Sequence, residues 1–259
     1  MYNDILKIGP LTVKGYGLMI AIGFIVAIYV GEWLARKKEI DDEQIFPMAV
    51  WCLAMGFLGA KVLYCIVDFH TLITTPQDVL MGNGFVVYGG IISGVLTGYV
   101  FCRKNKLYFL DYLDVVLPSV AITQAFGRIG CFLAGCCYGL RTDSAFGVTF
   151  HHSDFAPNDV KLIPTQLISS AGLFFIAFIL IRYLLKSKRS GATGALYMIL
   201  YSIGRFMIEF LRGDNRGEVA FLSTSQFISL FILCVGFVLL AKSGNNEKQV
   251  VKTNKEEKN

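Results

Sequence analysis

The chain has 259 residues, of which 54% are hydrophobic and 17% charged, and its mean hydropathy is +0.57. Apolar stretches of about 18 residues or more recur along it, which excludes an ordinary soluble domain and indicates an all-α integral membrane protein. The net charge of +5 comes from basic residues spread over the ends of these stretches. A nucleic-acid-binding face is therefore not expected.

About seven transmembrane helices are expected in chain order, each about as long as the hydrocarbon core requires. Their ranges are 16–35, 47–67, 84–102, 108–126, 165–185, 193–211 and 222–241. The fourth contains Asp111, Asp114 and Pro118, so we expect its membrane-embedded part to be short or broken. The spans are expected to form a single transmembrane domain over 1–244, followed by a polar, disordered cytoplasmic tail over 245–259.

The distribution of Lys and Arg predicts the orientation, since basic residues in short loops stay on the cytoplasmic side. With seven spans, one side of the membrane receives the basic groups near 36–38, 103–106 and 186–189 and those of the tail. The loop near 68–83, on the opposite side, contains no Lys or Arg. The N-terminus is therefore expected outside and the C-terminus in the cytoplasm.

The third expected span is rich in glycine. Gly90, Gly94 and Gly98 repeat every four residues, a spacing that allows the backbones of two helices to approach closely. The pair Gly89-Gly90 beside Tyr88 could also shape a site near the outer end of the span.

Arg128 stands among apolar residues and glycines in the segment 127–139, which reads Gly-Arg-Ile-Gly-Cys-Phe-Leu-Ala-Gly-Cys-Cys-Tyr-Gly. A cation at membrane depth is a functional-site hypothesis by default. Glycines beside it would let the backbone crowd an anionic ligand.

The sixth expected span contains four polar residues, Tyr201, Arg205, Glu209 and Arg212. In a helix they share one face within an arc of about 80°. Arg205 and Glu209 could neutralise each other, and Arg212 could reach the interface. If Arg128 converges on this face, net positive charge remains buried. A lipid phosphate would compensate it, since the guanidinium fork binds phosphate oxygens in bidentate fashion.

Cys131, Cys136 and Cys137 fall in the glycine-rich segment and are followed by His151-His152. Thiolates and imidazoles could bind a soft or borderline metal. Their spacing matches no standard zinc pattern, however, and adjacent cysteines are awkward for one tetrahedral site. A disulfide, a reactive thiol and plain packing are the alternatives, and neither a metal nor a cofactor is predicted.

These motifs resemble the prolipoprotein diacylglyceryl transferase family, bacterial membrane enzymes that move a diacylglyceryl group from phosphatidylglycerol onto a lipoprotein precursor. The resemblance covers most of the chain: Tyr16-Gly17, Gly59-Ala-Lys61, Tyr88-Gly-Gly90, the segment 127–139, Pro164-Thr-Gln166 and the run from Tyr201 to Arg212. It implies a multi-pass protein of the bacterial cytoplasmic membrane with an external N-terminus. The implied partners are phosphatidylglycerol and the lipobox peptide of a prolipoprotein.

The chain departs from the family's central signature at three polar positions. The signature reads Gly-Arg, any residue, Gly or Ala, Asn-Phe, an apolar residue, Asn, any residue, Glu, two more and Gly. Here Cys131 and Ala134 replace the asparagines and Cys136 replaces the glutamate. Tyr88 stands where the family commonly has a histidine. The phosphate-binding cations are thus retained, whereas candidate proton-handling groups are replaced.

The resemblance implies that Arg128 and Arg205 are catalytic through the phosphate of the leaving group, and that Tyr88 is catalytic in place of the histidine. Substrate contacts are assigned to Tyr16, Gly89, Gly90, Gly127, Gly130, Gly139, Tyr201, Glu209 and Arg212. Two alternatives remain open. One is a divergent phospholipid-dependent transferase with a cysteine of the cluster as nucleophile. The other is a non-catalytic protein that binds or transports an anionic lipid.

Overall fold

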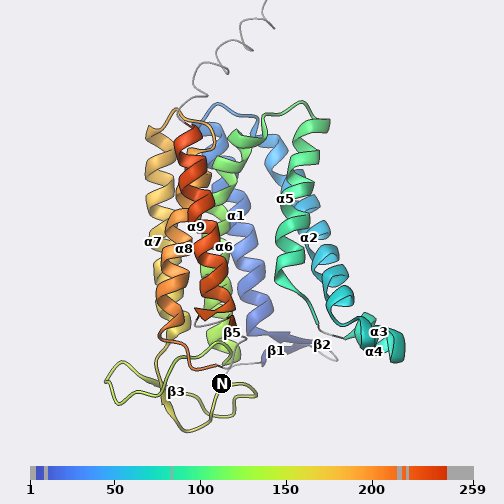
Figure 1. Cartoon of the computed structure of the whole chain (residues 1–259), viewed down its shortest axis with the longest axis vertical. Helices are drawn as coiled ribbons and strands as arrows, with labels where there is room; N and C mark the ends of the chain where they lie inside the picture. The colour runs from blue at the N-terminus through green and yellow to red at the C-terminus, as the bar shows by residue number, and fades with distance from the viewer. Residues whose placement is uncertain (1–3, 9–10, 83, 215–217, 220–221, 244–259) are drawn as a thin grey trace, which may run out of the picture. The chain divides into compact units, whose positions relative to one another are not determined.

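The computed structural model describes residues 4–8, 11–82, 84–214, 218–219 and 222–243 and is mainly helical (Figure 1). The expected tail over 245–259 lies outside the described residues. The chain forms two compact units. Unit 1 comprises Met1–Lys38 and Leu113–Asn259, and unit 2 comprises Glu39–Tyr112.

Among the described residues, five segments are long and apolar enough to cross a membrane: Gly15–Lys37, Asp42–Val67, Phe109–Ala134, Thr165–Lys186 and Thr224–Ser243. The other two expected spans also form helices, α5 (Val87–Lys104) and α8 (Ala192–Glu209), of 18 residues each. Both are rich in glycine and polar groups, which makes them less apolar than the five. Large apolar side chains such as Trp51 and Phe231 remain exposed, as expected of helix surfaces that face lipid.

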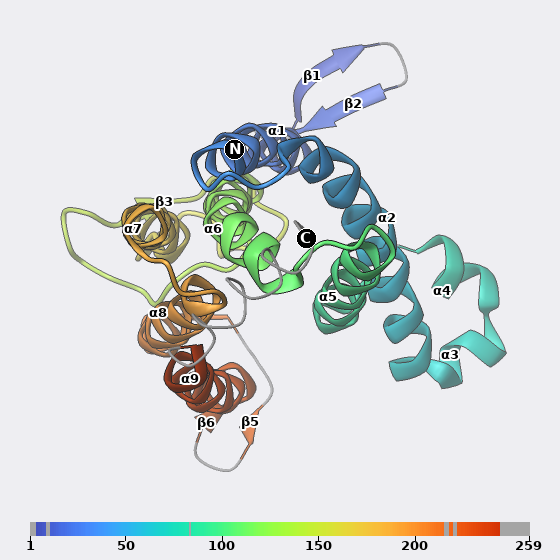
Figure 2. The same cartoon turned by 90° about the horizontal axis from the view of Figure 1, so that it is seen from above.

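Unit 1 is a bundle of long helices. Its helices are α1 (Gly15–Lys37), most of α6 (Phe109–Ala134), α7 (Thr165–Lys186), α8 and α9 (Thr224–Ser243). Viewed along their length, α8 lies between α7 and α9 (Figure 2). The part of unit 1 that the structure describes also has three antiparallel strand pairs: β1 (Asp4–Ile8) with β2 (Leu11–Lys14), β3 (Val148–Thr149) with β4 (Lys161–Leu162), and β5 (Glu218–Val219) with β6 (Leu222–Ser223).

The fourth expected span, α6, is one continuous helix of 26 residues. The expectation of a short or broken element is therefore wrong. Asp114 is only 3% exposed, and its burial is compensated by hydrogen bonds that its carboxylate accepts from the backbone N–H groups of Gly191 (2.7 Å) and Gly194 (2.8 Å). It thus caps the N-terminus of α8, where unpaired donors and the helix dipole favour a carboxylate.

Close packing joins the helices of unit 1. A Cβ added at Gly23 of α1 would lie 2.8 Å from the Cβ of Phe126 on α6. Ser170 of α7 donates a hydrogen bond to the backbone oxygen of Ala125 (3.0 Å). These contacts fix α6 between α1 and α7, and α6 extends past the predicted end at 126 to Ala134. The helix therefore carries the segment around Arg128 that the sequence singled out.

Unit 2 is built on α2 (Ile45–Val67) and α5, with a short 3-10 helix η1 (Asp42–Gln44) and the short helices α3 (Phe69–Thr74) and α4 (Pro76–Met81). Glycines let the two long helices touch. A Cβ at Gly89 would lie 2.6 Å from the Cβ of Leu63, and one at Gly90 would lie 3.2 Å from the oxygen of Gly56. The packing role predicted for the glycines of this span is confirmed at Gly90.

Candidate functional site

A cavity of about 250 Å³ lies in unit 1 between α6, α7 and α8. Arg128 faces it from α6, and Tyr201 and Arg205 face it from α8. The structure thus brings together three residues that the sequence placed in one site. The rest of the lining is largely apolar: Ile168, Ser169, Gly172, Leu173, Ile176, Gly204, Met207, Ile208 and Leu211. The lining residues from α7 were not predicted, because none of them is charged or aromatic.

Arg205 is held from two sides. Its Nη1 lies 2.9 Å from Oε2 of Glu209, one turn later on α8, and the two side chains are 12% and 7% exposed. Its Nη2 donates a hydrogen bond of 2.7 Å to Oγ of Ser225 on α9. The i,i+4 ion pair, which the sequence analysis left open as an alternative, is therefore present. Ser225 was not predicted, because nothing in the sequence aligns α9 with α8.

Arg128 contributes the excess charge of the cavity. It is partly buried and forms no hydrogen bond or ion pair with any residue that the structure describes. Because Arg205 and Glu209 neutralise each other, the described lining carries one net positive charge. An unpaired cation in an apolar cavity favours an anionic ligand.

Arg212 does not share the helix face predicted for it, because α8 ends at Glu209. Its guanidinium, 5% exposed, instead binds the carboxylate of Asp214 in bidentate fashion, through Nε (2.8 Å) and Nη2 (2.7 Å). The charge of Arg212 is thus matched within its own turn. Asp214 was overlooked in the sequence, although it is only two residues away.

Gly139 is needed for packing. A Cβ added there would lie 2.6 Å from the oxygen of Ile163 and 2.8 Å from that of Leu211. Gly139 and Leu140 therefore run between the backbone at Ile163 and the backbone at Leu211. The N–H of Gly139 donates a hydrogen bond to the oxygen of Ile163 (3.1 Å), and that of Leu140 donates one to the oxygen of Leu211 (2.9 Å). This packing fixes the loop after α6 against the end of α8. Substrate contact by Gly139 remains a prediction.

The other predicted residues fall in two places. Tyr16, at the start of α1, packs on Gly130, where an added Cβ would lie 3.1 Å from its Cδ2. Gly127 faces open space, with nothing within 4 Å of an added Cβ. Tyr88 is 44% exposed in the first turn of α5. It and Gly89 belong to unit 2, and their roles in a site remain predictions.

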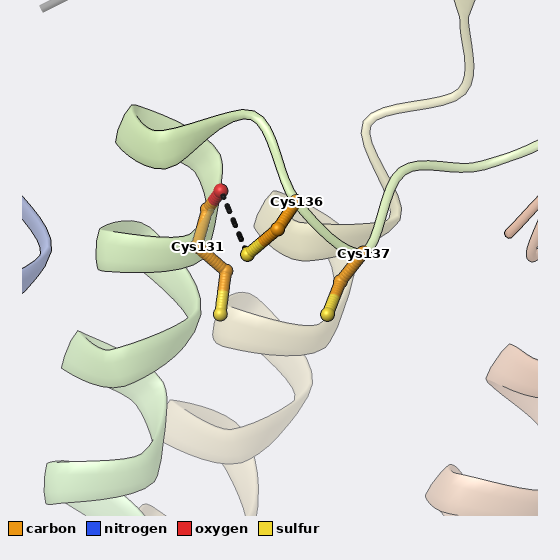
Figure 3. A group of neighbouring side chains, drawn as sticks. All are labelled: Cys131, Cys136 and Cys137. Carbon is orange, nitrogen blue, oxygen red and sulfur yellow. Dashed lines mark hydrogen bonds between the residues drawn. The ribbon is translucent and has the colours of Figure 1, made fainter. Parts of the chain in front are cut away.

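The cysteines of the segment converge. The Sγ atoms of Cys131, Cys136 and Cys137 all lie within 4.8 Å of one another (Figure 3), and none of the three forms a disulfide within the described part of the chain. Hydrogen bonds from the other two thiols, together with the nearby guanidinium of Arg212, lower the pKa of Cys137. His151 is not part of this group, since its Nδ1 pairs with Asp159 at 2.6 Å. These thiols are the residues of the described chain that could hold a metal.

Comparison with known proteins gives a consistent result. The family model described as prolipoprotein diacylglyceryl transferase matches residues 3–242. A phosphatidylglycerol–prolipoprotein diacylglyceryl transferase of Clostridium tetani is 48% identical over 227 residues, which is 87% of this chain and 91% of the relative. A second from Clostridium perfringens is 44% identical, covering 90% and 92%, and one from Finegoldia magna is 34% identical, covering 94% and 95%. The chain therefore belongs to the prolipoprotein diacylglyceryl transferase family.

Proposed function

We propose that the protein transfers a diacylglyceryl group from phosphatidylglycerol to the lipobox cysteine of a prolipoprotein, forming a thioether and releasing glycerol phosphate. The observation that carries the proposal is Arg128, which has no hydrogen-bond or ion-pair partner among the described residues, beside the neutral pair of Arg205 and Glu209. The phosphodiester of phosphatidylglycerol has one negative charge, which complements the single excess charge of the cavity. The names of the relatives support the same two substrates.

The reaction requires the substrate thiol to lose its proton and its sulfur to attack the glycerol carbon that bears the phosphate ester. The carbon–oxygen bond then breaks, and its electron pair leaves with glycerol phosphate. Arg128 and Arg205 stabilise the negative charge that grows on this leaving group, which favours the transition state over the ground state. Glu209 and Ser225 hold Arg205 in place beforehand, so the guanidinium needs little reorganisation.

The lining suits a lipid substrate. Ile168 and Met207, at the edge of the cavity, are 45% and 62% exposed, so the cavity opens beside apolar helix surface. A phospholipid could place its phosphate next to Arg128 while its acyl chains stay in the bilayer. Tyr201 lines the cavity, and its hydroxyl would hydrogen-bond the head group. Its ring is held in place by stacking on Tyr197, at a centroid distance of 5.6 Å.

Tyr88 is proposed to take the thiol proton in place of the family's histidine. Because its reference pKa is about 10, it requires a strong cationic field to act at neutral pH. Tyr16 is proposed to contact the head group, as it packs on Gly130, two residues after Arg128 on α6.

We further propose that α5 and α8 also cross the membrane, giving seven spans with the N-terminus outside in the bacterial cytoplasmic membrane. Each has 18 residues and would be about 27 Å long, close to the hydrocarbon thickness of about 30 Å. The last turn of α5 carries Arg103 and Lys104, basic residues that favour the cytoplasmic side. Green fluorescent protein fused to the C-terminus should fluoresce, whereas alkaline phosphatase there should be inactive; the reverse would refute the orientation.

The activity can be tested with purified protein in phosphatidylglycerol vesicles and a synthetic lipobox peptide. Mass spectrometry should show a diacylglyceryl adduct on the peptide cysteine, and none on a matched peptide with serine at that position. An adduct on Cys131, Cys136 or Cys137 would instead favour a divergent transferase. Lipid binding without any adduct would favour a binding or transport protein.

A further inference from the structure

The three cysteines of the 131–137 segment form a preorganised group. Cys131 lies in the last turn of α6, and Cys136 and Cys137 lie in the turn that follows, so two neighbouring elements supply the thiols (Figure 3). The side chains of all three converge on one space, with every pair of Sγ atoms within 4.8 Å. Simple packing of small apolar side chains does not require such convergence.

The turn is held in this conformation by backbone contacts. The backbone N–H of Cys136 donates to the oxygen of Cys131 (3.1 Å). From α7, the side chains of Gln166 and Thr165 donate to the oxygens of Cys136 (2.8 Å) and Cys137 (2.9 Å). These partners hold the backbone that carries both thiols, as the surroundings of a metal site must do.

The backbone at Cys137 is strained, with φ of 60°. A residue other than glycine rarely adopts this left-handed backbone conformation, which costs it about 1–2 kcal/mol. Gly135, two residues earlier, has φ of 77°, which glycine tolerates freely. The two left-handed residues place the adjacent Cys136 and Cys137 so that both face Cys131, which overcomes the difficulty that neighbouring cysteines pose for one site.

We propose that Cys131, Cys136 and Cys137 bind one Zn²⁺ through their three thiolates and leave a fourth coordination position open. Zn–S bonds of about 2.3 Å in tetrahedral geometry set the sulfur atoms about 3.8 Å apart. The separations of up to 4.8 Å therefore need small side-chain rotations and no change of the backbone. Each thiol releases its proton to water on binding.

Two arginines lie beside the three thiols. Arg128 is three residues before Cys131 on α6, so the two share a helix face, and they interact electrostatically. Arg212 interacts with Cys137 from the other side. The zinc site would thus adjoin the cavity in which the lipid phosphate is proposed to bind.

The open position suits the thiol of the lipobox cysteine, an assignment that rests on the proposed function. Coordination would replace its S–H bond by an S–Zn bond, and the proton would pass to Tyr88, the base proposed above, so that deprotonation would not depend on a histidine. The bound sulfur would attack the glycerol carbon, and the carbon–oxygen electron pair would leave with glycerol phosphate. The product thioether is neutral, so it would be a weak ligand and dissociate.

Zinc content tests the binding site without reference to activity. Full-length protein purified without reducing agent or chelator should contain close to one zinc per chain by mass spectrometry of the metal. The variants Cys131→Ser, Cys136→Ser and Cys137→Ser should each lose about tenfold in zinc affinity or more. Cys234→Ser, on the exposed surface of α9, is the matched control and should keep the metal. Zinc-free wild-type protein, equal zinc in all variants, or a disulfide between two of the three cysteines would overturn the proposal.

Cobalt gives a readout that does not depend on the folding of variants. Wild-type protein loaded with Co²⁺ should show the visible absorption of tetrahedral thiolate coordination, and the cysteine lipobox peptide should shift it while the serine peptide should not. An unchanged spectrum with both peptides would overturn the fourth-ligand assignment. Transfer at an undiminished rate by zinc-free protein would overturn it too, with the proposed function intact. Zinc binding without any transfer would refute the proposed function while the metal site stands.

Discussion

Arg128 and Arg205 face the same cavity but should respond differently to the same substitution. Arg128 has no partner among the described residues, whereas Arg205 neutralises Glu209, which is 7% exposed. Arg128→Gln should therefore leave the protein stable and remove activity. Arg205→Gln should remove both, because it leaves a carboxylate buried without its cation. The double variant Arg205→Gln/Glu209→Gln should recover stability and remain inactive.

The expected magnitudes follow from these contacts. Loss of the partner of a buried ion pair costs about 3–5 kcal/mol, whereas replacing both partners is close to neutral. Arg128→Gln should change the free energy of unfolding by about 0.5 kcal/mol or less. Its activity should fall further. Two charge-assisted hydrogen bonds to phosphate contribute about 1.5–3 kcal/mol each, which corresponds to a loss of about 10²–10⁴ in kcat/KM.

Thermal unfolding in detergent and transfer to the lipobox peptide measure the two effects on the same samples. Arg182→Gln is a matched control, because Arg182 is an exposed arginine of unit 1 on α7, outside the cavity. It should change neither quantity. The reasoning is refuted if Arg128→Gln keeps transfer within about threefold of wild type, less than 1 kcal/mol of transition-state stabilisation. Destabilisation of Arg128→Gln as large as that of Arg205→Gln would refute it as well.

Four further substitutions test other parts of the account. Gly204→Leu should fold, since nothing lies within 4 Å of an added Cβ. It should nevertheless fill the cavity and reduce the rate of transfer at least about tenfold, whereas Gly204→Ala should reduce that rate less. Gly139→Ala should lower stability by about 1–3 kcal/mol, because its Cβ would meet two carbonyl oxygens; an unchanged unfolding temperature would contradict this packing. Asp114→Ala removes the cap of α8 and should cost about 1–2 kcal/mol in thermal unfolding, whereas Asp114→Asn, which keeps one acceptor, should cost less. Tyr88→Phe should lower kcat by about 10² or more while vesicle binding persists, and full activity would exclude Tyr88 from proton transfer.

The sequence predicted the helices and the main cation because both produce strong local signals. Long apolar stretches identify membrane helices, and Arg128 is conspicuous among glycines. The pair of Arg205 and Glu209 follows from their spacing of four residues, which places neighbours on one helix face. These features depend on one helix at a time and need no knowledge of how helices pack.

The errors arose where neighbouring elements decide the outcome. Asp114 suggested a broken span because a carboxylate is costly at membrane depth. Its capping of α8 was not visible in the sequence, since it joins residues 77 positions apart along the chain. Arg212 was placed on the helix face because the end of α8 at Glu209 has no clear stop signal. The convergence of the three thiols was likewise hidden, since their spacing matches no standard ligand pattern. It depends on two left-handed backbone positions and on hydrogen bonds from α7.

The most direct measurement of the central claim is the simultaneous quantification of both products from phosphatidylglycerol with a labelled glycerol head group. The account predicts one labelled glycerol phosphate released for each thioether formed on the lipobox cysteine. Both should be lost together in Arg128→Gln, while Arg182→Gln retains them. Released glycerol phosphate without peptide thioether, or folded wild-type protein that forms neither product, would contradict it.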